Sequence, residues 1–146
     1  MTFDQFKLLI QRTEAQDPTL LSSPFAEPPA TEVKISEIQT LLGAQLPASF
    51  VHFLKIYGGG MFGYADILSL ITSEVDYIIT SQPTDAKTLQ FVAFSPNGSG
   101  DYYGFPIVGG SCEDRILFWD HEQNELDPTR YVDFFDFMAK VALLIE

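Results

Sequence analysis

The sequence has few of the residues that most often carry chemistry. It contains one cysteine, two histidines and eight lysines and arginines in 146 residues. A single cysteine, Cys112, excludes an intrachain disulfide, which is consistent with a reducing compartment. No apolar run approaches the ~18 residues that a membrane-spanning helix requires. The N-terminal residues include early acids and lack the apolar core of a signal peptide. We therefore expect a cytoplasmic protein with no membrane partner.

The shortage of basic residues leaves a large acidic excess. Twenty aspartates and glutamates give a formal net charge of −12. A surface of this sign repels nucleic-acid phosphates, so nucleic acid is not an expected partner. Complementary charge steers encounters between proteins, so the acidic excess favours a basic protein partner. The same charge is also found in proteins for which it serves solubility alone, and the sequence leaves both interpretations open.

Aromatic residues are abundant, with thirteen phenylalanines and six tyrosines, and 46% of all residues are hydrophobic. A chain of this length and composition is able to bury the core of one domain. We divide it into a main body, 31–146, and an N-terminal part, 1–30. The N-terminal part consists of a helix and a proline-rich arm that lies on the body, with Leu20, Leu21 and Phe25 available for docking.

The first half of the sequence predicts helices. An amphipathic helix is expected over 2–15, where Thr2 and Gln5 have the spacing of a capping box, and the prolines of 16–30 predict an irregular connection. Thr31 caps a second helix that ends at Gly43, where positive φ is tolerated. A third helix begins near Pro47 and carries its apolar residues on one face before glycines 58–60 end it.

The second half predicts mainly strands. Strands are expected at 67–71, 90–94, 102–108 and 115–119, with a short helix after Ser73 and a polar loop over 120–128. The close spacing of the last three strands requires antiparallel pairing. A final helix begins after the capping residue Asp133. The fold class is therefore α+β, with a central, mostly antiparallel sheet flanked by N-terminal helices and a C-terminal helix.

No catalytic or metal-binding signature is present. Asp120, His121 and Glu122 are three possible ligands in a row, but neighbours in an extended chain point to opposite sides and do not meet on one ion. Asn97 begins an alternating pattern like that of a calcium loop, but the pattern lacks the glycine and glutamate that such a loop requires. We expect no metal, no cofactor and no enzymatic activity.

Three single residues have more than one interpretation. Acids beside Cys112 raise the pKa of its thiol, so it is not expected to act as a nucleophile. His52 lies off the apolar face of its helix and is expected at the surface. Trp119 is interpreted either as a core aromatic at the end of a strand or as an interface anchor beside charged residues.

Several short motifs, taken in order, resemble the SUKH superfamily, which contains bacterial immunity proteins and fungal cell-wall-assembly regulators. The resemblance covers about residues 31–142. The matching motifs are Leu42-Gly43, Leu46-Pro47, Phe50, Phe53-Leu54, Gly58-Gly59, the strand 90–94, Gly100-Asp101-Tyr102, Trp119-Asp120-His121-Glu122 and the helix start 133–138. Two departures from the family pattern are conservative: Asp133 replaces a capping serine and Met138 replaces leucine. The segment 61–88 matches only loosely.

This resemblance implies a binding protein of α+β fold. Our first hypothesis is an immunity-type protein that neutralises a cognate toxin, such as a basic nuclease domain, by steric and electrostatic occlusion. The alternatives are a regulatory or scaffold module without a toxin, and a small hydrolase that would require Asp101, Asp120 and His121 to meet in a pocket. Turns and strand ends supply the partner-binding candidates. These are Asp101, Tyr102, Tyr103, Glu113, Asp114, Asp120 and Glu122.

Overall fold

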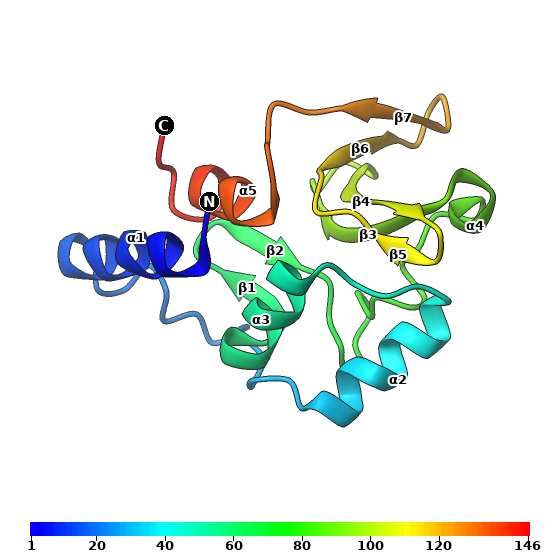
Figure 1. Cartoon of the computed structure of the whole chain (residues 1–146). Coiled ribbons are helices and arrows are strands. Elements are labelled where there is room, and N and C mark those ends of the chain that lie inside the picture. The colour runs from blue at the N-terminus through cyan, green and yellow to red at the C-terminus, as the bar shows by residue number, and fades with distance from the viewer.

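In the computed structural model, which describes all 146 residues, three helices come first, a series of strands interrupted by one short helix follows, and a last helix ends the fold (Figure 1). The α+β class predicted from the sequence is confirmed. The helices are α1 (Phe3–Gln16), α2 (Glu32–Leu42), α3 (Ala48–Tyr57), α4 (Ala86–Leu89) and α5 (Phe134–Val141). The strands are β1 (Gly60–Phe62), β2 (Ala65–Ile67), β3 (Phe91–Pro96), β4 (Tyr102–Val108), β5 (Ser111–Cys112), β6 (Leu117–Asp120) and β7 (Glu125–Pro128).

The predicted helix boundaries are confirmed by their caps. Thr2 and Gln5 form a reciprocal capping box at the start of α1. The side chain of Thr31 accepts the N–H of Lys34 at the start of α2. Asp133 accepts the N–H of Asp136 at the start of α5. Short-range hydrogen bonds of this kind depend only on neighbouring residues, so the sequence predicts them well.

The arm between α1 and α2 is held by its backbone. The N–H of Met61 donates to the carbonyl of Phe25, and the N–H of Glu27 donates to the carbonyl of Gly59. A methyl group on Gly60 would lie 2.4 Å from the Phe25 carbonyl oxygen, so the arm passes where a side chain would stand. The prediction that Phe25 docks is wrong, because this side chain is 74% exposed. Leu21 does pack against the core.

The main sheet is an antiparallel meander in the order β3-β4-β6-β7, with β5 added to the end of β4. Tyr102 pairs with Trp119 and Tyr103 with Phe118, which sets the register between β4 and β6. Strand β7 pairs only with β6 and lies at the outer margin of the molecule in Figure 1. It is four residues long and ends at Pro128, a residue that cannot donate a further backbone hydrogen bond.

The core lies between the inner face of this sheet and helices α3 and α5. The ring of Phe50 on α3 is 5.6 Å from Phe94 and 5.0 Å from Phe134, measured between ring centroids. Phe105 of β4 stacks on Phe94 at 4.5 Å. All four side chains are fully buried. This aromatic cluster fixes the helices against the strands and so positions the turns at the sheet ends.

Three predicted elements differ from the structure. The strand expected at 67–71 is wrong beyond Ile67, where β2 ends; β2 pairs with β1 in a hairpin that turns at Gly63, whose φ is +57°. The helix expected after Ser73 is a series of turns with Val75 fully exposed. The loop expected over 120–128 contains β7, whose polar residues suit an exposed edge strand. No helix is long and apolar enough to cross a membrane.

Candidate functional site

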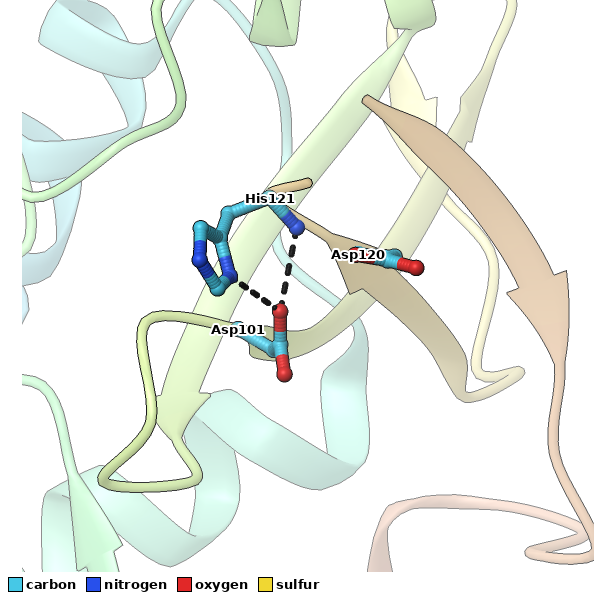
Figure 2. A group of neighbouring side chains, drawn as sticks. All are labelled: Asp101, Asp120 and His121. Carbon is cyan, nitrogen blue, oxygen red and sulfur yellow. Dashed lines mark hydrogen bonds and ion pairs between the residues drawn. The ribbon is translucent and has the colours of Figure 1, made fainter. Parts of the chain in front are cut away.

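Asp101 and His121 join two turns at one end of the main sheet (Figure 2). Asp101 ends the turn between β3 and β4, and His121 begins the turn between β6 and β7. Oδ1 of Asp101 accepts the backbone N–H of His121 at 3.0 Å and lies 2.7 Å from the ring Nδ1. The side chain of Asn97 donates to Oδ2 of Asp101 at 3.0 Å. These contacts fix the carboxylate and tie the two turns together.

The contact between Asp101 and His121 changes the pKa of both side chains. The backbone and side-chain hydrogen bonds from His121 lower the pKa of Asp101. The hydrogen bond to Asp101 raises the pKa of His121 above its usual 6.5, and the nearby charges of Asp101, Glu122 and Asp120 act in the same direction. His121 is therefore charged over a wider pH range than an isolated histidine. It remains the single cationic partner of this carboxylate.

A row of carboxylates crosses the strands beside this pair. Asp120 of β6 lies directly opposite Glu125 of β7. The carboxylate of Asp120 also lies within 4.8 Å of Asp101 and His121. Glu122 follows in the connecting turn. We call Asp101, Asp120, Glu122 and Glu125 the acidic row.

No lysine or arginine forms an ion pair with any member of the acidic row. Like charges placed opposite each other on neighbouring strands destabilise a sheet. A cationic surface from outside would relieve this repulsion. The row therefore has the electrostatic properties of a site for a basic partner.

The opposite face of the same strands carries an aromatic row. Tyr102, Trp119 and Leu126 are neighbours across β4, β6 and β7, and the rings of Tyr102 and Trp119 lie 6.1 Å apart. All three side chains are half-buried. The indole N–H of Trp119 donates to Asn124, which in turn donates to Asp85. Trp119 thus packs against the sheet surface while part of its ring remains accessible. Its position is intermediate between a core aromatic and an exposed interface anchor.

The other predicted partner-binding residues lie elsewhere. Tyr103 points to the inner face, where its ring is 5.0 Å from that of Phe137. Glu113 and Asp114 follow β5 and lie near the far end of β4, where the N–H of Glu113 donates to the carbonyl of Pro106. Asp114 accepts the N–H of Phe134 at 2.8 Å and so supports the start of α5. The structure therefore groups Asp101, Asp120 and Glu122, with Tyr102 on the reverse face, and separates the other three.

Asp101, Asp120 and His121 form the group of ligand-type atoms that the hydrolase alternative requires. Neighbouring residues in one strand do not converge, but Asp101 reaches Asp120 and His121 from a different turn. The second requirement, a pocket, is not met in the five principal cavities, which other residues line. Oδ1 of Asp101 already accepts two bonds from His121. The geometry is that of a fixed surface pair with one additional carboxylate.

Cys112 is buried, and burial raises the pKa of its thiol to about 12. The direction predicted from the sequence is confirmed, but the cause is burial and not the neighbouring acids. His52 is exposed as predicted, with its ring 3.8 Å from that of Phe3.

One cavity could not be predicted from the sequence, because its residues come from three separate segments. It has a volume of about 410 Å³ and lies between the arm, the β1–β2 hairpin and the turns that follow β2. Four acids line it: Glu27, Asp66, Glu74 and Asp76. No local motif joins residues so far apart in sequence, so only the tertiary structure reveals the group.

Comparison with known proteins identifies the family. The profile of the SMI1-KNR4 cell-wall family, SUKH_6, matches residues 32–138, which is most of the chain. No curated protein and no solved structure gave a significant match. The matched region includes α2, α3, the whole main sheet and the first half of α5. The chain therefore belongs to the SMI1-KNR4 family of the SUKH superfamily, whose domains mediate protein–protein interactions.

Proposed function

We propose that the protein is an immunity-type protein that binds a basic toxin domain and neutralises it by covering its functional surface. The observation that carries this proposal is the acidic row, which places four carboxylates at the end of a rigid sheet with no lysine or arginine to pair with them. A nuclease domain, which must attract phosphates, would present the complementary charge. The net charge of −12 adds long-range attraction.

The mechanism follows from how the row is held. Hydrogen bonds hold the Asp101 carboxylate, and the β6–β7 pairing holds the backbone that carries Asp120 and Glu125, before any partner arrives. This preorganisation reduces the freedom that is lost on binding. Opposite charge accelerates association, and close contact then excludes the toxin's substrate. No bond is made or broken in this mechanism.

Two double variants with equal net charge test the proposal. Asp120→Lys with Glu125→Lys changes the formal charge by four, from −12 to −8. Glu14→Lys with Glu37→Lys makes the same change on the exposed faces of α1 and α2. The product of the adjacent gene is co-expressed with each form. We expect the first variant to lose both the complex and protection from growth arrest, and the second to retain them. Equal loss in both variants, or no toxic neighbour at all, would overturn the proposal.

A regulatory or scaffold module is the second candidate, favoured by the cell-wall description of the matching family. Such a module would use the same row to hold a resident partner and would not protect against a toxin. A complex recovered from the native host that contains a non-toxic protein, and that is lost in the Asp120→Lys/Glu125→Lys variant, would identify this function.

A further inference from the structure

The cavity beside the proline-rich arm combines an apolar rim with an acidic interior. Its rim carries Phe25, which is 74% exposed, and Ile71, which is 39% exposed. Its walls carry Glu27, Asp66 and Asp76. Exposed apolar side chains and half-buried acids therefore line the same cavity.

The cavity is built by rigid contacts and does not depend on the exposed side chains. Backbone hydrogen bonds hold the arm at Phe25 and Glu27 against Met61 and Gly59. Oε1 of Glu27 accepts the N–H of Leu70 at 3.2 Å, which directs this side chain toward the segment after β2. The hydroxyl of Ser95 donates to the carbonyl of Asp66 at 2.6 Å and fixes β2 against β3. The backbone around the cavity and the side chain of Glu27 are therefore held before a ligand binds.

The carboxylates in the cavity affect each other. Burial raises the pKa of Asp66, and the charges of Asp76 and Glu27 raise it further. None of Glu27, Asp66, Glu74 and Asp76 has a lysine or arginine within ion-pairing distance. The negative charge of these four acids is therefore not neutralised by any basic side chain of this protein.

The shape of the cavity selects the kind of cation. No three of its acids bring ligand atoms within 4.8 Å of one another, so they do not converge on one metal ion, whose bonds to oxygen are about 2–2.6 Å. Acids spread around a space of about 410 Å³ suit a broad, planar cation with several N–H donors. An apolar rim suits a side chain with a methylene stem, and the ring of Phe25 offers a face on which a guanidinium stacks.

We infer that this cavity receives an arginine side chain of the basic protein partner, with its stem against Phe25 and Ile71 and its guanidinium among Glu27, Asp66 and Asp76. The inference rests on the proposed function, because it takes from it that the partner is a basic protein. It adds a second anchor, formed by other elements than the acidic row. The arm, which lies outside the region matched by the family profile, thereby contributes to recognition.

The test uses the full chain and a small probe. Nα-acetyl-arginine methylamide is titrated into ¹⁵N-labelled protein, with the matching citrulline derivative as an isosteric neutral control. We expect saturable shifts of the amide signals of Gly60, Met61, Asp66 and Ile71, and no such shifts with citrulline. Asp66→Asn with Asp76→Asn should weaken binding by about fivefold or more. Asp120→Asn with Glu125→Asn should leave it unchanged. A dispersed spectrum verifies that each variant is folded.

Two results would overturn the inference. One is an equal response to citrulline and arginine, which would mean that the cavity does not recognise charge. The other is a set of shifts that follows the acidic row or spreads evenly over all carboxylates. The partner assay separates this inference from the proposed function. Arginine binding at the cavity without any neutralised toxin supports the inference and removes the proposed function. Toxin neutralisation that the cavity variants retain in full removes the inference alone.

Discussion

Asp101 binds His121 twice, through the backbone N–H at 3.0 Å and through the ring Nδ1 at 2.7 Å, although twenty positions separate them in sequence. The contact connects the β3–β4 turn to the β6–β7 turn. Because one carboxylate oxygen accepts both bonds, neutralising that oxygen should loosen both turns together and alter the acidic row beside them.

The first prediction concerns the pKa of His121. In Asp101→Asn the charge and the strong acceptor that stabilise the imidazolium are removed, so the pKa of His121 should fall toward its usual 6.5. Carbon-detected or ¹H–¹³C NMR titration of the ring measures this directly. Glu14→Gln, on α1, serves as the control and should leave the His121 titration unchanged. An unaltered pKa in Asp101→Asn would show that the contact is not formed in solution.

The second prediction concerns the stability of the fold against pH. The pKa of His121 is raised in the folded state, so its contribution is complete below 6.5 and is lost as pH rises through the folded pKa. The pKa of Asp101 is lowered, so its contribution is present above 3.8 and is lost as pH falls through the folded value. Urea unfolding at a series of pH values should show both losses in the wild type and a flatter profile in Asp101→Asn.

The third prediction separates two costs of replacing a glycine: a steric clash with the arm, and the strain of a positive φ. Gly60→Ala places a methyl group 2.4 Å from the Phe25 carbonyl oxygen at a φ of +80°. Gly98→Ala has a similar φ of +83° with no atom within 4 Å. The Gly98 variant should lose about 1 kcal/mol of unfolding free energy, and the Gly60 variant about 3 kcal/mol. Equal losses in urea denaturation would mean that the arm does not pass over Gly60.

The fourth prediction compares a buried ring with an exposed one. Phe50 is fully buried among Phe94, Phe105 and Phe134, so Phe50→Ala should cost about 3–5 kcal/mol through lost contacts and the cavity that remains. Phe25→Ala should stay within about 0.5 kcal/mol of the wild type, because that ring is 74% exposed. Chemical denaturation of both variants measures the difference. A large loss in Phe25→Ala would contradict the exposed position of the ring.

The fifth prediction is a gain in stability. Asp66→Asn removes a charge that burial, Asp76 and Glu27 all disfavour, so the variant should have a higher Tm than the wild type at pH 7. The pKa of Asp66 is raised in the folded state, so the wild type should gain stability as pH falls through that value, and the variant should lack this gain. Thermal scans at pH 7 and pH 4 test both statements. Destabilisation at pH 7 would show that the Asp66 carboxylate has a favourable partner.

The parts of the fold that were predicted from the sequence are those fixed by neighbouring residues. Thr2, Thr31 and Asp133 cap their helices through bonds that span three residues. Strands β3, β4 and β6 are recognisable because aromatic and β-branched residues alternate or run together in them. Strand β7 was missed because its residues, Glu125 to Pro128, are polar and its strand character comes from pairing with β6.

The site was only partly predictable for a related reason. Turn position predicted Asp101, Asp120 and Glu122 as candidates, because binding residues gather where strands end, and the structure places these three near one another. The side on which Tyr103 falls depends on the placement of α5, which a single sequence does not give. The contact of Asp114 with Phe134 and the cavity around Asp66 both depend on long-range packing. Their residues carry no local signal at all.

The open edge of the sheet limits how another chain could add to it. Strand β7 is short, carries Glu125 and Asp127, and ends at Pro128, so a further chain finds few backbone groups to pair with and meets repulsion if it is another copy of this protein. A partner at this edge would have to contact mainly side chains, because few backbone groups are free for pairing. Substitution of exposed side chains on β7 would therefore change what this edge contacts, while the hydrogen bonds between β6 and β7 stay the same.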